Sequence, residues 1–229
     1  MIILFYDVIN SIYQPYSFKE IIFVLHLNKC HETMTNTSSF KHFLIHKPKG
    51  YLSQFIYEGK RKGSKKLLGE LGKFPAGTMS IGRLDEKTEG LLILTTNGME
   101  SENVRSSKVE KEYFVQVDGL ITEEAILQLK NGLEIGILGK RYVTKPCKAK
   151  TISEVDVTRF PIEIYQIRDP KHGPTSWISI TVTEGKFRQI RKMTAGVGFP
   201  TLRLVRVRIG KIHLNLPIGE IKEIIEVDV

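Results

Sequence analysis

The sequence predicts an α+β fold, a largely antiparallel sheet with flanking helices. Many short stretches alternate apolar and polar residues as half-buried strands do, and fewer have the spacing of an amphipathic helix. Strands and helices do not alternate regularly, which argues against a parallel β-α-β architecture. With 229 residues, 41% of them hydrophobic and 26% charged, the chain can bury a substantial core.

Residues 1–39 differ from the remainder of the chain. The apolar start is interrupted by Asp7 and has no basic segment before it, so a secretory signal is not indicated. Residues 31–39 are polar and end any strand or helix pattern. We therefore expect 1–39 to be a poorly ordered extension, with Met34 as a candidate translation start, and 40–229 to be the folded domain.

The charge balance favours a polyanionic partner, because 34 Lys and Arg residues stand against 25 Asp and Glu, a net charge of +9. Cys30 and Cys147 are far apart and lack a partner motif, as expected in a reducing compartment such as the cytoplasm. The cluster of His26, Cys30 and His31 fits no common zinc spacing, so no metal is predicted. The longest apolar runs are far shorter than the ~20 residues that a membrane helix needs.

The first predicted strand is 43–46, followed by a turn at Lys47-Pro-Lys-Gly50. Residues 65–73 have a short helical pattern with their leucines on one face. Five cations precede or open this segment, and they are typical either of a solvated face or of a loop that contacts phosphate groups. These cations are Lys60, Arg61, Lys62, Lys65 and Lys66.

The stretch 79–98 holds a carboxylate between two apolar segments. Its second segment, 91–94, is a continuous β-prone run that ends at the turn signal Asn97-Gly98. Gly82-Arg83-Leu84-Asp85 comes before this run, which places Asp85 on a loop. An Asp followed by Glu-Lys-Thr is also typical of a helix N-cap or a tight turn, so these residues alone leave a catalytic role open.

The middle of the chain predicts a short helix at 98–106 and a strand at 111–117, with Tyr113 on the same face as two valines. A tyrosine in such a strand is typically a core residue. An amphipathic helix follows up to residue 131, with Thr122 as its N-cap and Gly132 at its C-terminal end. Residues 133–165 predict successive short strands.

The C-terminal third predicts a strand at 176–183, a helix from Lys186 to about Gly196, and a last strand at 202–209. The helix has an apolar face and a basic face, and the basic residues are Arg188, Arg191 and Lys192. In the last strand Leu204 and Arg206 share one face, whereas Arg203 lies on the other. Two faces of one strand cannot both meet a ligand, so some of Arg203, Arg206 and Arg208 must be structural.

Three of these stretches, in this order, resemble the motifs of pseudouridine synthases of the ribosomal small-subunit synthase A type. The stretch 82–98 is similar to the active-site motif, and Lys111-Glu-Tyr113 to the second motif. Residues 184–193 are similar to the third motif, and 198–206 continue it. Pro174-Thr-Ser-Trp177, the helix that follows and 199–204 together resemble one subgroup of the family. The resemblance covers about residues 42–215. It implies an extended mixed sheet with a central active-site cleft, so that 40–229 would be a catalytic domain with two lobes around one cleft.

The resemblance also implies roles for individual residues. Asp85 would be the catalytic carboxylate, Arg191 its ion-pair partner, and Tyr113 the residue that stacks on the uracil and helps remove the C5 proton. Leu204 would belong to the base pocket. The residues implied to contact RNA are Lys47, Lys60, Arg61, Lys62, Lys65, Lys66, Arg83, Arg188, Lys192 and Arg206.

The implied reaction is isomerisation of a specific uridine in ribosomal RNA to pseudouridine, with the 23S RNA of the large subunit as the expected substrate. It needs neither a redox change nor a group donor, so no cofactor is expected. We expect a cytoplasmic monomer that acts on ribosomal RNA or a pre-ribosomal particle, away from membranes. The alternative is a catalytically silent RNA-binding or ribosome-assembly factor on the same scaffold, which would keep the basic surface without needing Asp85.

Overall fold

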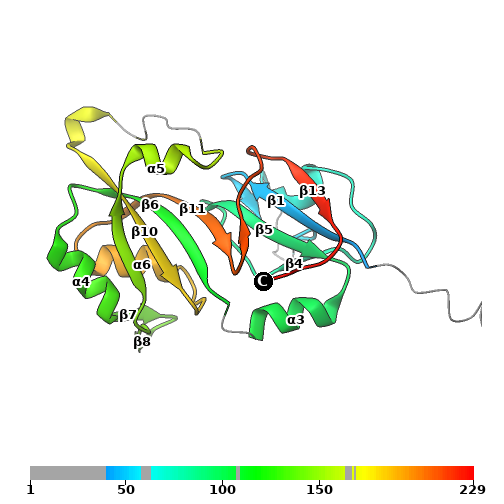
Figure 1. The fold of residues 1–229 in the computed structure, drawn as a ribbon, viewed down its shortest axis with the longest axis horizontal. Helices are drawn as coiled ribbons and strands as arrows, with labels where there is room; N and C mark the ends of the chain where they lie inside the picture. Colours follow the sequence, from blue (N-terminus) through cyan, green and yellow to red (C-terminus); the bar gives the residue numbers. More distant parts are fainter. Residues whose placement is uncertain (1–39, 58–62, 107–108, 163–166, 168) are drawn as a thin grey trace, which may run out of the picture. The chain divides into compact units, whose positions relative to one another are not determined.

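The computed structural model describes residues 40–57, 63–106, 109–162, 167 and 169–229 (Figure 1). The expected extension at 1–39 lies outside these ranges and stays a prediction. The same holds for the cations Lys60, Arg61 and Lys62. Within the described ranges, none of the helices combines the length and the apolar character that crossing a membrane requires.

A nine-stranded sheet organises the described part of residues 40–229. All neighbouring strands are antiparallel except β5 and β11, so the expected mixed, mostly antiparallel sheet is confirmed. The main path runs through β13 (Ile221–Ile224), β1 (His42–Lys47), β5 (Glu89–Thr95), β11 (Thr201–Ile209), β6 (Lys111–Asp118), β10 (Thr175–Val182) and β9 (Lys148–Ile152). Two further strands, β4 (Met79–Ile81) and β12 (Ile212–His213), pair with β5 and β11.

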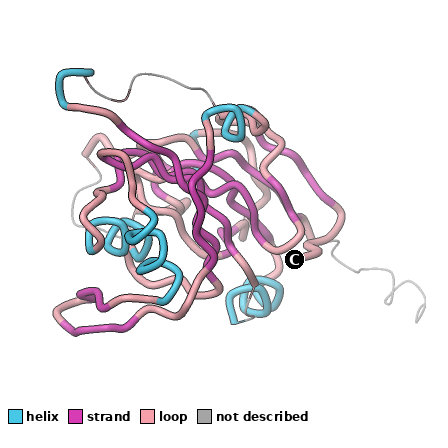
Figure 2. Tube along the Cα trace, turned by 60° about the vertical axis from the view of Figure 1, so that its left-hand side comes forward, coloured by secondary structure: helices cyan, strands magenta, loops and turns pink. Residues whose placement is uncertain are grey.

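Shorter elements surround this sheet. Helices α3 (Gly98–Ser106), α4 (Glu123–Asn131), α5 (Glu154–Thr158) and α6 (Gln189–Gly196) flank it, as Figure 2 shows. The remaining elements are the parallel pair β2 (Tyr51–Leu52) and β3 (Lys66–Leu67), the hairpin β7 (Glu134–Ile137) and β8 (Lys140–Val143), and the 3-10 turns η1 (Leu68–Glu70) and η2 (Pro170–His172).

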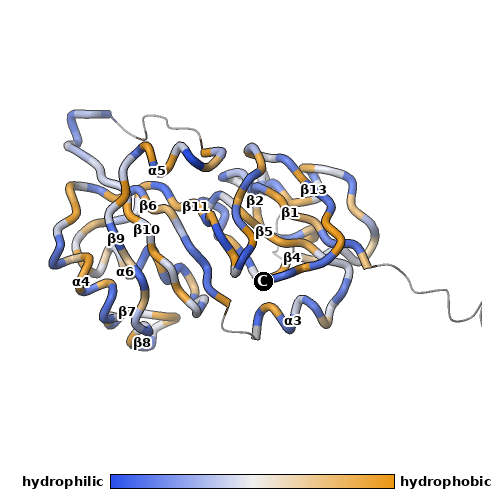
Figure 3. Tube along the Cα trace, in the orientation of Figure 1, coloured by the Kyte–Doolittle hydropathy of each residue, from blue (hydrophilic) through white to orange (hydrophobic). Residues whose placement is uncertain are grey.

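The core fills both faces of the sheet. Along β5, Leu91 and Ile93 pack into one apolar cluster, whereas Leu92 and Leu94 pack into another. A strand that is covered on both faces reads as a continuous apolar run, which is why 91–94 show no alternation. Figure 3 shows this apolar character along β1 and β5.

Several elements match their sequence patterns because the signals are local. Thr122 caps α4, its side chain accepting a hydrogen bond from the Ala125 amide at 3.2 Å, and Gly132 ends the helix with φ +85°. On β6, Phe114 and Val115 enter opposite clusters, as the alternation predicts.

Two predicted elements are wrong. Residues 65–73 form β3 and one 3-10 turn instead of an α-helix, because Gly69 and Gly72 weaken helix propensity and the Glu70 side chain caps the Leu67 amide. The succession of strands predicted for 133–165 is interrupted by α5. Ser153 starts this helix through a capping box with Asp156.

The two halves of the sheet meet where β5 and β11 run parallel, at Val205 opposite Glu89 and Arg206 opposite Gly90. Gly90 has φ +106°, and a Cβ atom there would lie 2.3 Å from the Arg206 carbonyl oxygen. The close approach of the strands therefore requires glycine at this position.

We expect Gly90→Ala to lower the free energy of unfolding by about 3 kcal/mol or more, because it adds a backbone clash to the cost of a positive φ. Gly50→Ala is the matched control. Gly50 also has a positive φ, +91°, but no atom lies within 4 Å of its added Cβ. The control should cost about 1 kcal/mol. Equal losses in urea titrations of the two variants would contradict the proposed clash.

Candidate active site

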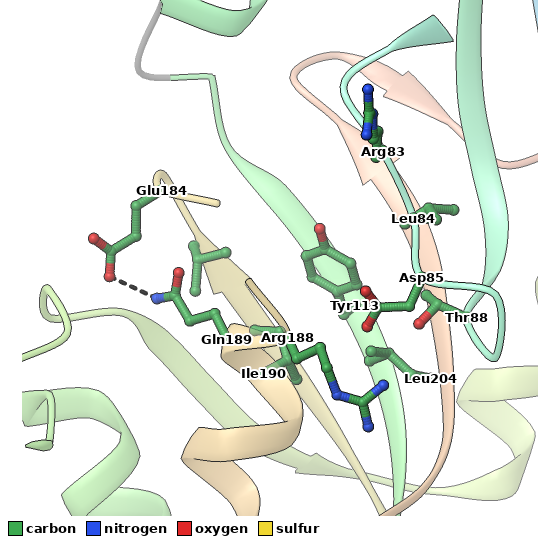
Figure 4. Close-up of a pocket in the computed structure, with 11 residues that line it drawn as sticks. Arg83, Leu84, Asp85, Thr88, Tyr113, Glu184, Arg188, Gln189, Ile190 and Leu204 are labelled. Atoms are coloured by element: carbon green, nitrogen blue, oxygen red, sulfur yellow. Dashed lines mark hydrogen bonds between the residues drawn. The ribbon is translucent and has the colours of Figure 1, made fainter. Parts of the chain in front are cut away.

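A pocket opens between the loop that joins β4 to β5 and the segment that leads into α6 (Figure 4). It brings together five residues that the sequence analysis singled out, from four separate segments. These are Arg83, Asp85, Tyr113, Arg188 and Leu204. The other lining residues are Leu84, Thr88, Val182, Glu184, Gln189 and Ile190.

The loop that carries Asp85 is fixed by hydrogen bonds on both sides of it. The Ser53 hydroxyl donates to the Leu84 carbonyl at 2.8 Å and accepts from the Leu84 amide at 2.9 Å. The Thr88 amide donates to the Asp85 carbonyl at 3.0 Å, which closes a tight turn. The turn expected at Asp85 is thus present, and it holds a half-buried carboxylate against the pocket.

Tyr113 and Leu204 come from the neighbouring strands β6 and β11, where Leu204 pairs with Val115 and Arg206 with Tyr113. Leu204 is buried, and Tyr113 is half-buried against the same apolar cluster. In Figure 4 the Tyr113 ring lies beside the Asp85 carboxylate. Tyr113 therefore packs against the core and also lines the pocket.

Arg188 reaches the pocket through an unusual backbone conformation. Its φ of +51° and ψ of +34° are left-handed, and α6 begins after it, at Gln189 instead of the expected Lys186. The Gln189 side chain accepts from the Lys186 amide at 3.0 Å and donates to Glu184 at 2.6 Å. A non-glycine residue in this conformation costs about 1–3 kcal/mol and needs such support. The Arg188 side chain extends toward the side of the pocket with Asp85 and Leu204 (Figure 4).

Arg191 ties α6 to the Asp85 loop, but not in the expected manner. Its Nη2 donates to the Lys87 carbonyl at 2.8 Å, and no ion pair joins it to Asp85 among the described residues. Burial and then repulsion from Arg188 lower the pKa of Arg191, while attraction from Asp85 and Glu89 raises it. The predicted direct ion pair is therefore not formed, and Arg191 acts on the carboxylate from a longer distance.

The family described as RNA pseudouridylate synthase matches residues 41–196 of this sequence. The chain belongs to this family. It is 38% identical over 188 residues to ribosomal large subunit pseudouridine synthase E of Vibrio parahaemolyticus, covering 80% of this chain and 74% of the relative. It is 36% identical over 179 residues to the protein of that name from Xanthomonas axonopodis pv. citri, and the match covers 75% of this chain and 87% of the relative.

A crystal structure of a pseudouridylate synthase shares the fold, with a TM-score of 0.63 over 81% of this chain and 70% of that one, at 24% identity. The family resemblance of the three sequence motifs is therefore confirmed. The segments 174–177 and 199–204 also suggest the synthase E type, in agreement with the names of these relatives.

Two of the arginines and lysines expected to contact RNA in this pseudouridylate synthase are buried, so that expectation is wrong for them. Lys47 is 0% exposed, and its Nζ donates to the Pro48 and Tyr51 carbonyls. Arg206 is buried, and its Nε donates to the Leu91 carbonyl at 2.8 Å. Both cations satisfy backbone carbonyls of the chain itself and offer no surface to a phosphate.

Arg203 and Arg208 are also structural. Arg203 forms a buried ion pair with Glu89, with 2.9 Å between its Nη2 and a carboxylate oxygen, across the junction of β11 and β5. Arg208 pairs with Glu110 and Glu112 next to it. The inference that some arginines of this strand must be structural is thus confirmed.

The remaining expected RNA contacts differ in their surroundings. Arg83 is exposed at the pocket mouth. Lys65 pairs with Glu86 at 2.6 Å, and Lys66 lies over the Tyr51 ring. Lys192 donates to the Gly136 carbonyl at 2.6 Å. These four, together with Arg188, stay predictions as RNA contacts.

Sequence reasoning missed four residues that shape the pocket: Ser53, Thr88, Glu184 and Gln189. Thr88 is buried, and its hydroxyl has no hydrogen-bond partner among the described residues, although it lines the pocket. Thr88, Glu184 and Gln189 lie within the recognised motifs 82–98 and 184–193, and only that position could have drawn attention to them. Ser53 had no signal, because its partner Leu84 is 31 residues away.

We expect Ser53→Ala to lower the free energy of unfolding by about 1–3 kcal/mol, because it leaves the buried Leu84 amide and carbonyl unsatisfied. Synthase activity should fall about 10-fold as the Asp85 loop shifts. Ser179→Ala is the control, since Ser179 is also buried but bonds to Glu112 on the sheet. It should lose stability and keep activity. Unchanged activity of Ser53→Ala would contradict the positioning role.

The burial of Lys47 predicts a specific dependence of stability on pH. Desolvation lowers the pKa of Lys47 to about 8. Below pH 8 the lysine is protonated in both folded and unfolded states, and between pH 8 and about 10.5 the unfolded state binds more protons. The folded state should therefore gain up to about 3 kcal/mol across this range relative to Lys47→Met. Parallel pH curves in chemical unfolding of the two proteins would contradict this burial effect.

Proposed function

We propose that this pseudouridylate synthase isomerises a specific uridine of ribosomal RNA, in the 23S RNA of the large subunit, with Asp85 as its catalytic carboxylate. The observation that carries the proposal is the convergence of Asp85, Tyr113 and Arg188 on one pocket. The substrate is suggested by relatives whose names specify the large ribosomal subunit. The excess of cations, a net charge of +9, suits an RNA substrate.

The reaction rearranges one nucleotide without any added group. The bond from N1 of uracil to C1′ of the ribose breaks, the base turns, and C5 bonds to C1′. The C5 proton is then lost and N1 gains a proton, so atoms and electrons balance within the substrate and solvent. We assign to Asp85 the step at C1′, where a carboxylate can add covalently or assist departure of the base.

The neighbours of Asp85 suit the handling of a detached uracil. We assign the Tyr113 ring to stacking on the base, and its hydroxyl to assisting removal of the C5 proton. Leu204 supplies an apolar wall that leaves the base free to turn. These walls would retain the uracil between bond breaking and bond formation.

The cations near the pocket would hold the charged parts of the substrate. Arg188 and Arg83 both line the pocket, and each guanidinium would donate hydrogen bonds to a phosphate group of the RNA. Arg191 would keep the Asp85 loop in place and favour the ionised carboxylate from a distance. A uridine within structured RNA must be flipped out to reach Asp85, at a cost of a few kcal/mol that such contacts offset.

We further propose that the enzyme acts as a monomer in the cytoplasm, on ribosomal RNA or a pre-ribosomal particle, and needs no metal or cofactor. The balanced reaction requires none. The competing proposal is an RNA-binding or assembly factor that has the same scaffold but no activity. Such a factor would have the same basic residues for binding RNA, but its function would not depend on the Asp85 carboxylate.

Asp85→Asn should reduce pseudouridine formation at least about 1000-fold, because the amide can neither add to C1′ nor stabilise charge there. The measurement is pseudouridine mapping of 23S ribosomal RNA after incubation with each protein, with folding and RNA affinity checked to be equal. Asp228→Asn, which disrupts only the exposed ion pair with Lys211, is the control and should retain full activity.

A modified site that is made by the wild type and the control but not by Asp85→Asn would support the proposal and identify the target. A site modified equally by all three proteins would rule out Asp85 as the catalytic group. Salt-dependent binding by all three without any modification, on naked RNA and on pre-ribosomal particles alike, would favour the inactive factor.

A further inference from the structure

One exposed aromatic side chain lies next in sequence to the pocket, and the proposed mechanism does not use it. Phe187 directly precedes the pocket residue Arg188, and it is 56% exposed. Exposed aromatic rings beside the sites of proteins that bind single-stranded nucleic acid commonly stack on bases, since every base offers a π face. The position of Phe187 therefore calls for a ligand with a flat apolar face.

The ring is held in place on one side by a fixed cation. The Lys192 ammonium lies 5.1 Å from the centre of the Phe187 ring. The same ammonium donates to the Gly136 carbonyl in β7 at 2.6 Å, so the hairpin β7–β8 orients it. Phe187 nevertheless remains exposed to solvent.

The backbone that carries Phe187 is also constrained. Gln189 caps the Lys186 amide and bonds to Glu184, as Figure 4 shows for the second contact. Glu184 in turn accepts hydrogen bonds from the Tyr142 hydroxyl and the Lys145 amide. The left-handed Arg188 lies on the other side of Phe187, so the backbone on both sides of this residue is constrained. A ligand would lose little free energy in ordering it.

The charges around the ring distinguish RNA from a protein partner. Lys186 and Arg188 flank Phe187 in sequence, and the Lys192 ammonium lies over its ring. The nearest carboxylate in sequence, Glu184, is engaged by the hydrogen bonds just described. A purely apolar partner would have to desolvate these cations, whereas a nucleotide supplies a flat base and a phosphate together.

We propose that Phe187 is a stacking platform for the unpaired base of a nucleotide adjacent to the target uridine. This inference rests on the proposed RNA substrate and adds a second base-binding position outside the pocket. While the target base enters the pocket beside Asp85, its neighbour stacks on the open face of Phe187, and the nearby cations hold the phosphates. The platform would stabilise the flipped-out arrangement of the substrate strand.

The test uses a short single-stranded RNA in which 2-aminopurine lies next to a uridine, because the fluorescence of this base is quenched on stacking. Binding and quenching are measured with the full chain at one salt concentration for the wild type, Phe187→Leu and Phe187→Trp. Phe40→Leu is the matched control, because Phe40 is similarly exposed, at 51%. It lies just before the first residue of β1, His42, and does not line the pocket. Thermal unfolding verifies that each variant is folded.

We expect Phe187→Leu to weaken binding about 10-fold and to abolish the quenching, with Phe187→Trp and Phe40→Leu both close to the wild type. Equal affinity and equal quenching for Phe187→Leu and the wild type would overturn the platform, as would absence of quenching in the wild type. Loss of binding in both Phe187→Leu and Phe40→Leu would also overturn it, because it would indicate a general effect of apolar surface.

The same proteins separate this inference from the proposed function. Quenching that depends on Phe187, in a protein that forms no pseudouridine in 23S RNA, would uphold the platform and reject the isomerase assignment for that RNA. The opposite result has two parts: Phe187→Leu and the wild type form pseudouridine equally at limiting RNA concentration, and they show the same quenching. This result would reject the platform and uphold the isomerase.

Discussion

The parallel contact between β5 and β11 is the constraint on which the pocket depends. Gly90 permits the two backbones to approach, and the buried pair of Glu89 and Arg203 crosses the same junction. The Asp85 loop leads directly into β5, whereas Leu204 lies on β11. A change in this junction would therefore move the Asp85 carboxylate relative to Leu204, although none of the three junction residues lines the pocket.

The cations of this chain divide into groups with different physical tasks. Lys47 and Arg206 are buried and satisfy backbone carbonyls, and Arg191 joins α6 to the Asp85 loop. Burying a charge is costly unless hydrogen bonds compensate it, so these residues are fixed parts of the scaffold. Arg83 and Arg188, which line the pocket, are exposed and therefore accessible to a phosphate group. Net charge alone overstates the surface available to RNA.

The segment from Glu184 to Gln189 contains three pocket-lining residues and the exposed Phe187. Its two ends bond to each other, and between them Arg188 lines the pocket while Phe187, its neighbour in sequence, is exposed. Through Tyr142, the hairpin β7–β8 supports the same segment. A hairpin that supplies no pocket residue thus contributes to the shape of the site, because it limits how the segment can move.

The sequence by itself determined the elements whose signals are local: the strand 91–94, the alternation of β6, and the caps of α4. The family motifs also identified Asp85, Tyr113 and Leu204, which the fold brings together. Only the tertiary structure decided which cations are buried, that Arg188 leaves the helix, and that Ser53 holds the Asp85 loop. Capping and alternation depend on neighbours within a few residues. The burial of a charge or the partner of a hydroxyl depends on residues far away in the chain, such as Leu84 for Ser53, and their positions follow from packing of the whole sheet.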